Sequence, residues 1–179
     1  MNFDGYISVA SITLPNGRVL SAVEAVNHGL ISRPSFVPGL DWPSLGKGEI
    51  PVGTNLHTNS GRQLLVYCFG NRAPITDFAC TSFGVGLGTT PPTVDDVDPE
   101  SAVDPLYGTE KLKPVNMIDY PEPFIARVSL TIAEAEAQGL LLTELGLFSG
   151  NGTLLNRALY DAPINKTNLA KTFLWRLRL

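Results

Sequence analysis

The residue of this sequence whose surroundings are least ordinary for its type is Glu144. It stands within an apolar stretch, residues 140–148, that consists mostly of leucine. A buried carboxylate without a partner costs several kcal/mol, so we expect this one to form an ion pair. Arg157 is the first candidate partner, and Arg127 and Arg176 are the next. An ion pair inside an apolar strand favours a structural role over that of a catalytic acid.

The other residues able to act as catalysts or metal ligands stand apart from one another. His28 and His57 have no acid or cysteine at ligand spacing, and a metal site or a general base needs such partners. No Gly-x-Ser-x-Gly sequence marks a nucleophilic serine. Cys68 and Cys80 form no Cys-x-x-Cys pair and are expected to be buried, apolar thiols. The sequence therefore predicts no enzymatic activity, no cofactor and no metal.

Two segments could in principle bind a phosphate or a cation. Gly84-Val-Gly-Leu-Gly is similar to a phosphate-binding loop, but its third glycine comes one position early and Pro91-Pro92 follows in place of a helix. We interpret it as a demanding bend between a strand and a loop. Residues 95–104 carry five carboxylates without the spacing of an EF-hand. A solvated acidic loop is the main interpretation there, with a weak calcium or magnesium site as the alternative.

Strands must position Glu144, and the last third of the chain predicts them clearly. Residues 124–134 and 169–179 alternate apolar and polar side chains with period two. Residues 139–148 and 153–160 flank a Ser149-Gly-Asn-Gly sequence that suits a hairpin turn. Successive strands with short connections predict a mainly β fold, an antiparallel β-sandwich or an open barrel.

The preceding part of the chain predicts fewer regular elements. We expect a strand over residues 5–15, a short helix over 19–31 and a second helix over 58–70, capped by Thr58 or Ser60. Residues 75–85 are predicted as a strand. Residues 94–120 are acidic and contain proline, so we expect a long excursion over the surface.

A long proline- and glycine-rich arm is the main feature of the N-terminal part. Residues 33–54 contain four prolines and four glycines, and such a loop is unusual inside a compact domain. We predict that this arm contacts a neighbouring subunit, with Trp42, Pro38 and Pro43 as interface candidates. The expected division is residues 1–54, with a strand, a short helix and the arm, and residues 55–179, a β-rich domain with the acidic excursion at about 94–120.

Composition excludes several classes of function. The net charge is −4 and no basic patch is evident, so general binding of nucleic acid is not expected. No run reaches the ~20 apolar residues that a membrane helix needs, and no secretory signal is apparent at the N-terminus. With 44% hydrophobic residues the chain has a globular composition. We expect synthesis in a reducing cytoplasm and no contact with a membrane.

Two blocks of sequence resemble a group of tailed-bacteriophage structural proteins. The first block contains Asn55-Leu-His-Thr-Asn-Ser-Gly-Arg-Gln-Leu-Leu, Ile75-Thr-Asp-Phe-Ala and Gly84-Val-Gly-Leu-Gly-Thr-Thr-Pro-Pro-Thr. The second contains Thr143-Glu-Leu-Gly-Leu-Phe, Gly152-Thr-Leu-Leu-Asn-Arg-Ala, Ile164-Asn-Lys-Thr and Thr172-Phe-Leu-Trp. The Thr143–Phe148 segment is also weakly similar to the phage tail-collar fibre domain.

This resemblance implies a β-rich virion component with no catalytic residues to transfer. We expect a neck, collar or tail subunit that attaches a fibre or belongs to a baseplate. A decoration or cement protein of the capsid is the alternative, and a module that binds host glycans is a second one. The partners expected are other virion proteins and copies of the chain itself, as a homotrimer or a higher ring.

Overall fold

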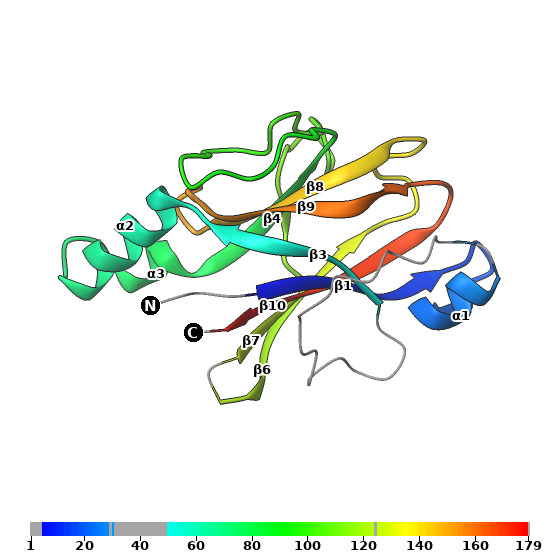
Figure 1. Ribbon diagram of the computed structural model, residues 1–179, viewed down its shortest axis with the longest axis horizontal. Coiled ribbons are helices and arrows are strands. Elements are labelled where there is room, and N and C mark those ends of the chain that lie inside the picture. Colours follow the sequence, from blue (N-terminus) through cyan, green and yellow to red (C-terminus); the bar gives the residue numbers. More distant parts are fainter. Residues whose placement is uncertain (1–4, 29, 31–49, 124, 179) are drawn as a thin grey trace.

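The computed structural model describes residues 5–28, 30, 50–123 and 125–178. Figure 1 shows a strongly curved assembly of strands with short helices at its two ends. Among the described residues, far more lie in strands than in the three short helices, so the predicted mainly β, sandwich-like class is confirmed. Among the described residues, no helix has the length and apolar character needed to cross a membrane.

The strands follow one another in a single antiparallel order, β5-β4-β8-β9-β3-β1-β10-β7-β6, with β2 paired to β1 beside this path. Their bounds are β1 Gly5–Thr13, β2 Val19–Ser21, β3 Ile50–His57, β4 Cys80–Gly86, β5 Lys113–Pro114, β6 Met117–Glu122, β7 Ile125–Ile132, β8 Leu141–Ser149, β9 Leu154–Asn165 and β10 Ala170–Arg178. The order brings the first strand and the last strand together at the middle of the sheet.

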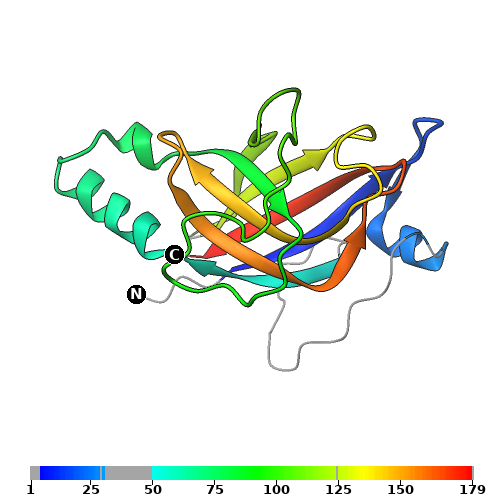
Figure 2. The same ribbon diagram turned by 90° about the horizontal axis from the view of Figure 1, so that it is seen from above.

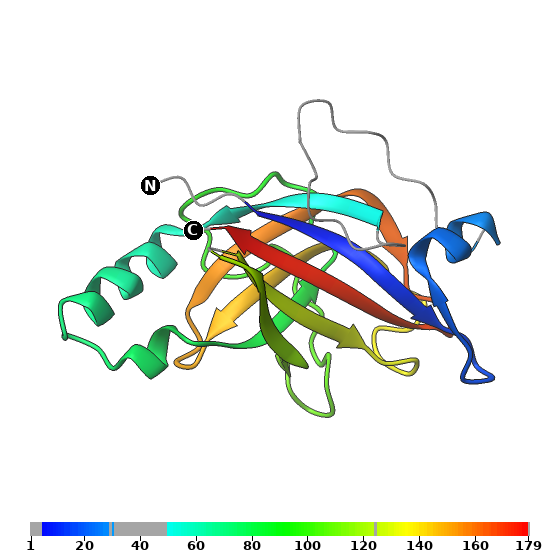
Figure 3. The same cartoon turned by 90° about the horizontal axis from the view of Figure 1, so that it is seen from below.

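The sheet folds over on itself, so that two layers enclose one apolar core. Strands β9, β8 and β4 form one layer, and β3, β1, β10, β7 and β6 form the other, as Figures 2 and 3 show from above and below. The predicted alternation in β7 and β10 is confirmed. Val128, Leu130 and Ile132 point inward from β7, and Phe173 and Trp175 from β10, because every second side chain of a strand faces the same side.

A short segment closes the curved sheet from one edge to the other. Val115 donates a hydrogen bond to the carbonyl of Thr81 on β4 (3.0 Å), and the next residue, Asn116, donates to the carbonyl of Ser129 on β7 (2.9 Å). The preceding β5 pairs with β4, and the following β6 pairs with β7. The prediction of a surface excursion over residues 94–120 is therefore wrong at this end, because the segment belongs to the sheet.

The helices are short and lie outside the layers. Helix α1 (Ala22–Asn27) is shorter than the predicted 19–31, because β2 occupies the first residues and Ser21 with Glu24 forms a capping box. Helix α2 (Asn59–Phe69) begins after Thr58 and ends at Gly70, as predicted. Helix α3 (Ile75–Phe78) contradicts the predicted strand over 75–85, of which only the part in β4 is extended.

The expected division after residue 54 falls inside β3. This strand pairs with β1 on one side and β9 on the other, so the first strand belongs to the same sheet as the C-terminal strands. Residues 50–54 of the predicted arm are therefore part of the sheet. The interface candidates Trp42, Pro38 and Pro43 lie outside the described residues.

Candidate functional site

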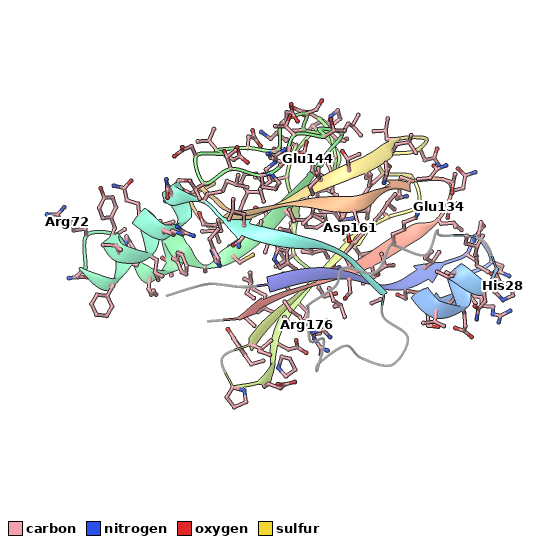
Figure 4. The ribbon with its side chains drawn as sticks, in the orientation of Figure 1. His28, Arg72, Glu134, Glu144, Asp161 and Arg176 are labelled. Atoms are coloured by element: carbon pink, nitrogen blue, oxygen red, sulfur yellow. The ribbon has the colours of Figure 1, made fainter. Side chains whose placement is uncertain are left out.

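Glu144 on β8 and Arg157 on β9 lie side by side on the outer face of their layer. They are covered by the β4–β5 connection (residues 87–112), and Figure 4 shows Glu144 between the strands and this connection. The Arg157 Nη2 atom lies 2.7 Å from Glu144 Oε2, and Nε donates to the same oxygen at 2.8 Å. Both side chains are buried. Of the three predicted partners for Glu144, the structure brings Arg157 to it.

The other two arginines have partners elsewhere. Arg127 on β7 forms an ion pair with Asp119 on β6, and the two residues lie opposite each other in the ladder. Arg176 on β10 donates to the hydroxyl of Ser8 on β1 at 3.4 Å. Neither residue stands in the layer that carries Glu144, so sequence spacing along the hairpin selects the correct partner.

The carboxylate of Glu144 also binds the backbone of the β4–β5 connection. Its Oε1 accepts from the N–H groups of Gly88 (2.9 Å) and Ser101 (3.0 Å), and its Oε2 accepts from the N–H of Glu100 (3.0 Å). Together with the guanidinium of Arg157 these donors occupy both oxygens. Such a carboxylate satisfies the polar groups of a covering loop, and it has no free position from which to accept a proton from a substrate.

Arg157 connects the same site to the acidic part of the connection. Its Nη1 donates to Asp96 Oδ2 at 2.6 Å, and its Nη2 donates to the carbonyl of Thr90 at 3.1 Å. The carboxylate of Glu100 lies 3.8 Å away from Nη2. The Arg157 guanidinium therefore joins β9 to Glu144 on β8 and to Asp96 and Thr90 in the loop. Its planar set of N–H donors suits several acceptors at once.

Hydrogen bonds within the site favour the ionised forms of Asp96, Glu100 and Arg157. Burial raises the pKa of Asp96, but hydrogen bonds from Arg157 and Thr93 outweigh this and leave it below its usual range. Burial also lowers the pKa of Arg157, yet its hydrogen bonds to Asp96 and Glu144 raise it overall. Hydrogen bonds from Thr90 lower the pKa of Glu100. Asp96, Glu100 and Arg157 are therefore ionised at neutral pH.

The glycines of Gly84-Val-Gly-Leu-Gly make room for this cluster. A Cβ atom on Gly86 would lie 2.8 Å from Glu144 Cδ, and one on Gly88 would lie 2.6 Å from Glu144 Oε1. Neither glycine has a positive φ. The interpretation as a bend that demands unusual dihedral angles is therefore wrong at these positions. Glycine is needed because the carboxylate approaches the backbone too closely for any side chain.

A register shift between Leu142 and Glu144 explains one further difference from the expected hairpin. Strict alternation would place Leu142 and Glu144 on the same face. Leu142 instead belongs to the core, while Glu144 lies on the outer face. The ladder pairs Leu142 with Ile164 but Glu144 with Leu159. An irregularity of this kind rotates the strand locally and cannot be seen in a periodic pattern.

Other carboxylates of the acidic loop also have partners within the protein. Asp98 forms an ion pair with Lys111, Asp95 accepts from the Asn59 amide at 2.9 Å, and Glu100 accepts from Thr90. Within the described ranges, no three groups of His, Cys, Asp and Glu stand close enough to hold a metal ion. Asp104 remains an exposed residue of the loop.

The histidines and cysteines lie on separate elements. His28 caps the end of α1 and is exposed, while burial lowers the pKa of His57, at the end of β3, to about 4. Cys68 on α2 and Cys80 on β4 are free thiols and partly buried. Burial raises the pKa of Cys80 to about 12, which disfavours the thiolate at neutral pH.

Sequence reasoning missed two buried lysines at one end of the core. Lys166 donates to the carbonyl of Glu134 at 3.1 Å, and Lys171 donates to the carbonyl of Asn165. Burial lowers the pKa of Lys171 to about 8, and the charge of Lys166 adds to the effect. The alternation of side chains along β10 could have revealed Lys171, because this residue shares the inward face of the strand with Phe173.

Comparison of the chain with protein-family models, with curated proteins and with solved structures found no match.

Proposed function

We propose that this chain is a non-enzymatic structural protein of a tailed-bacteriophage virion, a neck, collar or tail subunit that acts through contacts with other proteins. The observation that carries the proposal is the position of the residues on which the resemblance rests. Gly86 and Gly88 come from the first resembling block, and Glu144 and Arg157 come from the second. In the fold these residues meet in one buried cluster.

Contacts between the two blocks in the fold offer a physical reason why both occur in one chain. Gly88 and Glu144 are 56 positions apart in the chain, yet the N–H of one binds the carboxylate of the other. Blocks that recur in order along a sequence are expected to do so when they build one structural unit. The unit here fixes a long loop on a sheet, and its charged groups bind one another and the loop backbone.

A test of placement also separates the alternatives. The chain would be sought by mass spectrometry, with copy counting, in purified virions of the phage that encodes it. About six to eighteen copies per virion indicate a neck or tail subunit, and hundreds indicate the capsid-decoration alternative. Absence of the chain from virions that contain the other products of the same phage would overturn the proposal.

The glycan-binding alternative depends on exposed aromatic rings beside polar groups. Three aromatic residues predicted in loops, Trp42, Tyr107 and Tyr120, are the candidates for such rings. Trp42 lies outside the described residues, and the Lys113 ammonium lies over the ring of Tyr107, 5.2 Å from its centre. Tyr120 lies on β6 and is 78% exposed. Under the proposed function the exposed rings contact other proteins and do not bind glycans. A glycan array probed with the purified chain distinguishes the two functions, because only a glycan-binding module would give a signal.

A further inference from the structure

Two buried lysines lie close together at the end of the sheet where β9 turns into β10. Lys166 follows the last residue of β9, and Lys171 is the second residue of β10. Lys166 is 0% exposed and Lys171 1%, and the charge of the first lowers the pKa of the second. A lysine is almost never fully buried without a partner of opposite charge. The pair therefore requires a negatively charged group.

The protein satisfies only part of the hydrogen-bonding capacity of the two ammonium groups. Lys166 Nζ donates to the carbonyl of Glu134 at 3.1 Å, and Lys171 Nζ donates to the carbonyl of Asn165. An ammonium group has three N–H donors, so each lysine can donate to further acceptors. None of the ion pairs among the described residues includes either lysine.

The carboxylates nearest to the pair do not neutralise it. Glu136 and Glu134 raise the pKa of Lys166, but burial outweighs them and Lys113 acts against them. Both oxygens of Glu136 bind Lys113, at 2.7 and 2.6 Å, and Oε2 also accepts from the N–H of Ala133. Glu134 is exposed. Three ammonium groups thus face two carboxylates, and one of these carboxylates is already bound.

The ammonium groups lie just below the surface at this end of the molecule. Their hydrogen bonds are only partly buried, and Glu134, Asn165 and Thr167 around them are exposed. Figure 4 shows Glu134 at the end of the sheet near the turn between β9 and β10. A small ion needs to pass only these residues, whereas the burial of the lysines keeps the backbone of a nucleic acid away from them.

The positions of both lysines are fixed by the backbone. Lys171 pairs with Ile132 on β7 and with Ile12 on β1. The N–H of Lys166 donates to the carbonyl of Leu140 at 2.9 Å, and its carbonyl accepts from the N–H of Gly139 at 2.7 Å. The two ammonium groups are therefore held in place before a ligand arrives, which lowers the entropic cost of binding.

We infer that Lys166 and Lys171 bind a small oxyanion of the phosphate type between their ammonium groups. A dianion balances two positive charges, and its oxygens accept the N–H donors that the protein leaves unused. Bound there, it would connect the turn between β9 and β10 with the β7–β8 connection (residues 133–140). The site is separate from the Glu144–Arg157 cluster, and its ligand would bind whether or not the chain belongs to a virion.

Titration of the full chain with inorganic phosphate at neutral pH tests the site. Calorimetry should detect binding, and the melting temperature in about 10 mM phosphate should exceed that in chloride of equal ionic strength by about 3 °C or more. Amide NMR shifts on addition of phosphate should cluster at residues 133–140 and 165–171. This pattern locates the site without any substitution.

Methionine substitutions remove the charge and keep the length of the side chain. Lys166→Met and Lys171→Met should each weaken phosphate binding at least tenfold and remove most of the rise in melting temperature. Both variants should fold, because replacing a buried charge by an apolar side chain is often neutral or stabilising. Lys111→Met is the control, since Lys111 pairs with Asp98 in the β4–β5 connection and should leave the affinity unchanged.

Four results would overturn the inference. The first is a natural chain that shows neither heat of binding nor a higher melting temperature in phosphate. The second is an equal response of the natural chain and both methionine variants, which would be a general effect of the salt. The third is a cluster of NMR shifts elsewhere in the chain. The fourth is a short DNA duplex that binds through the two lysines more tightly than phosphate, which would make them a nucleic-acid contact.

Discussion

Removal of the Glu144 side chain tests whether the buried ion pair holds the β4–β5 connection on the sheet. In Glu144→Ala the N–H groups of Gly88, Glu100 and Ser101 lose their acceptor, and Arg157 keeps only its contacts with the connection. Loss of one member of a buried pair costs about 3–5 kcal/mol, and each buried unsatisfied donor adds about 1–3 kcal/mol unless water reaches it. Because two of the three donors are only partly buried, we expect a total loss of about 4 kcal/mol.

Removal of Arg157 should cost less. In Arg157→Ala the carboxylate of Glu144 keeps three backbone donors, and Asp96 can turn to water, so we expect a loss of about 2–3 kcal/mol. The double variant no longer contains an unpaired buried charge. Its loss should therefore be smaller than the sum of the single losses by about 2 kcal/mol. Full recovery is not expected, since the backbone donors above Glu144 still lack an acceptor.

The assay is urea unfolding at neutral pH, followed by tryptophan fluorescence, for the natural chain, both single variants and the double variant. Arg127→Ala combined with Glu144→Ala serves as the control, because Arg127 pairs with Asp119 in the opposite layer and its effect should add. Additivity of Glu144→Ala and Arg157→Ala within about 0.5 kcal/mol would refute the reasoning. So would a coupling of equal size between Glu144 and Arg127.

Three further perturbations address other parts of the argument. Gly86→Ala should destabilise the chain by about 2 kcal/mol or more, because its Cβ would meet the Glu144 carboxylate; Gly17→Ala, with open space but a φ of 79°, should cost only about 1 kcal/mol in the same unfolding assay. Lys171 has a folded-state pKa of about 8, below that of the unfolded chain, so its penalty is fully present below pH 8. Stability should rise between about pH 8 and 10 as the folded state releases this proton first. The rise should be smaller in Lys171→Met, where only Lys166, whose pKa burial also lowers, still contributes to it. Thr58→Ala should cost about 1–2 kcal/mol through loss of the α2 cap, and Thr58→Ser should retain most of it; equal losses in thermal unfolding would disprove the role of the hydroxyl.

The sequence predicts those parts of the fold in which a local pattern has one structural meaning. Period two in β7 and β10, the turn after Ser149 and the cap at Thr58 depend on neighbouring residues alone, and the structure contains each of them. The pairing of Glu144 with Arg157 also follows from local geometry. Glu144 and Arg157 lie on the two strands of a hairpin with a short turn, so only a few registers of strand pairing were possible.

The missed features depend on contacts between distant segments. Val103 and Leu106 belong to the core, and β5 belongs to the sheet, only through contacts with strands that lie far away in sequence. The acidic composition of this segment predicted a surface loop instead. Helix α3 was hidden by the β-type residues Ile75 and Phe78. The irregularity after Leu142 and the close approach of Glu144 to Gly86 arise from tertiary packing, which overrides local preference.

The central position of β10 has a consequence for the order in which the molecule can form. Strand β10 separates β1 from β7, and its ladder with β1 joins Gly5 to Leu177. During synthesis β1 and β7 therefore each keep one unpaired edge until β10 has left the ribosome. Open edges pair readily with other chains, and contacts of such long sequence separation form slowly. The sheet therefore cannot be completed before β10 has been synthesised, and conditions that slow aggregation of the nascent chain should increase the yield of folded protein.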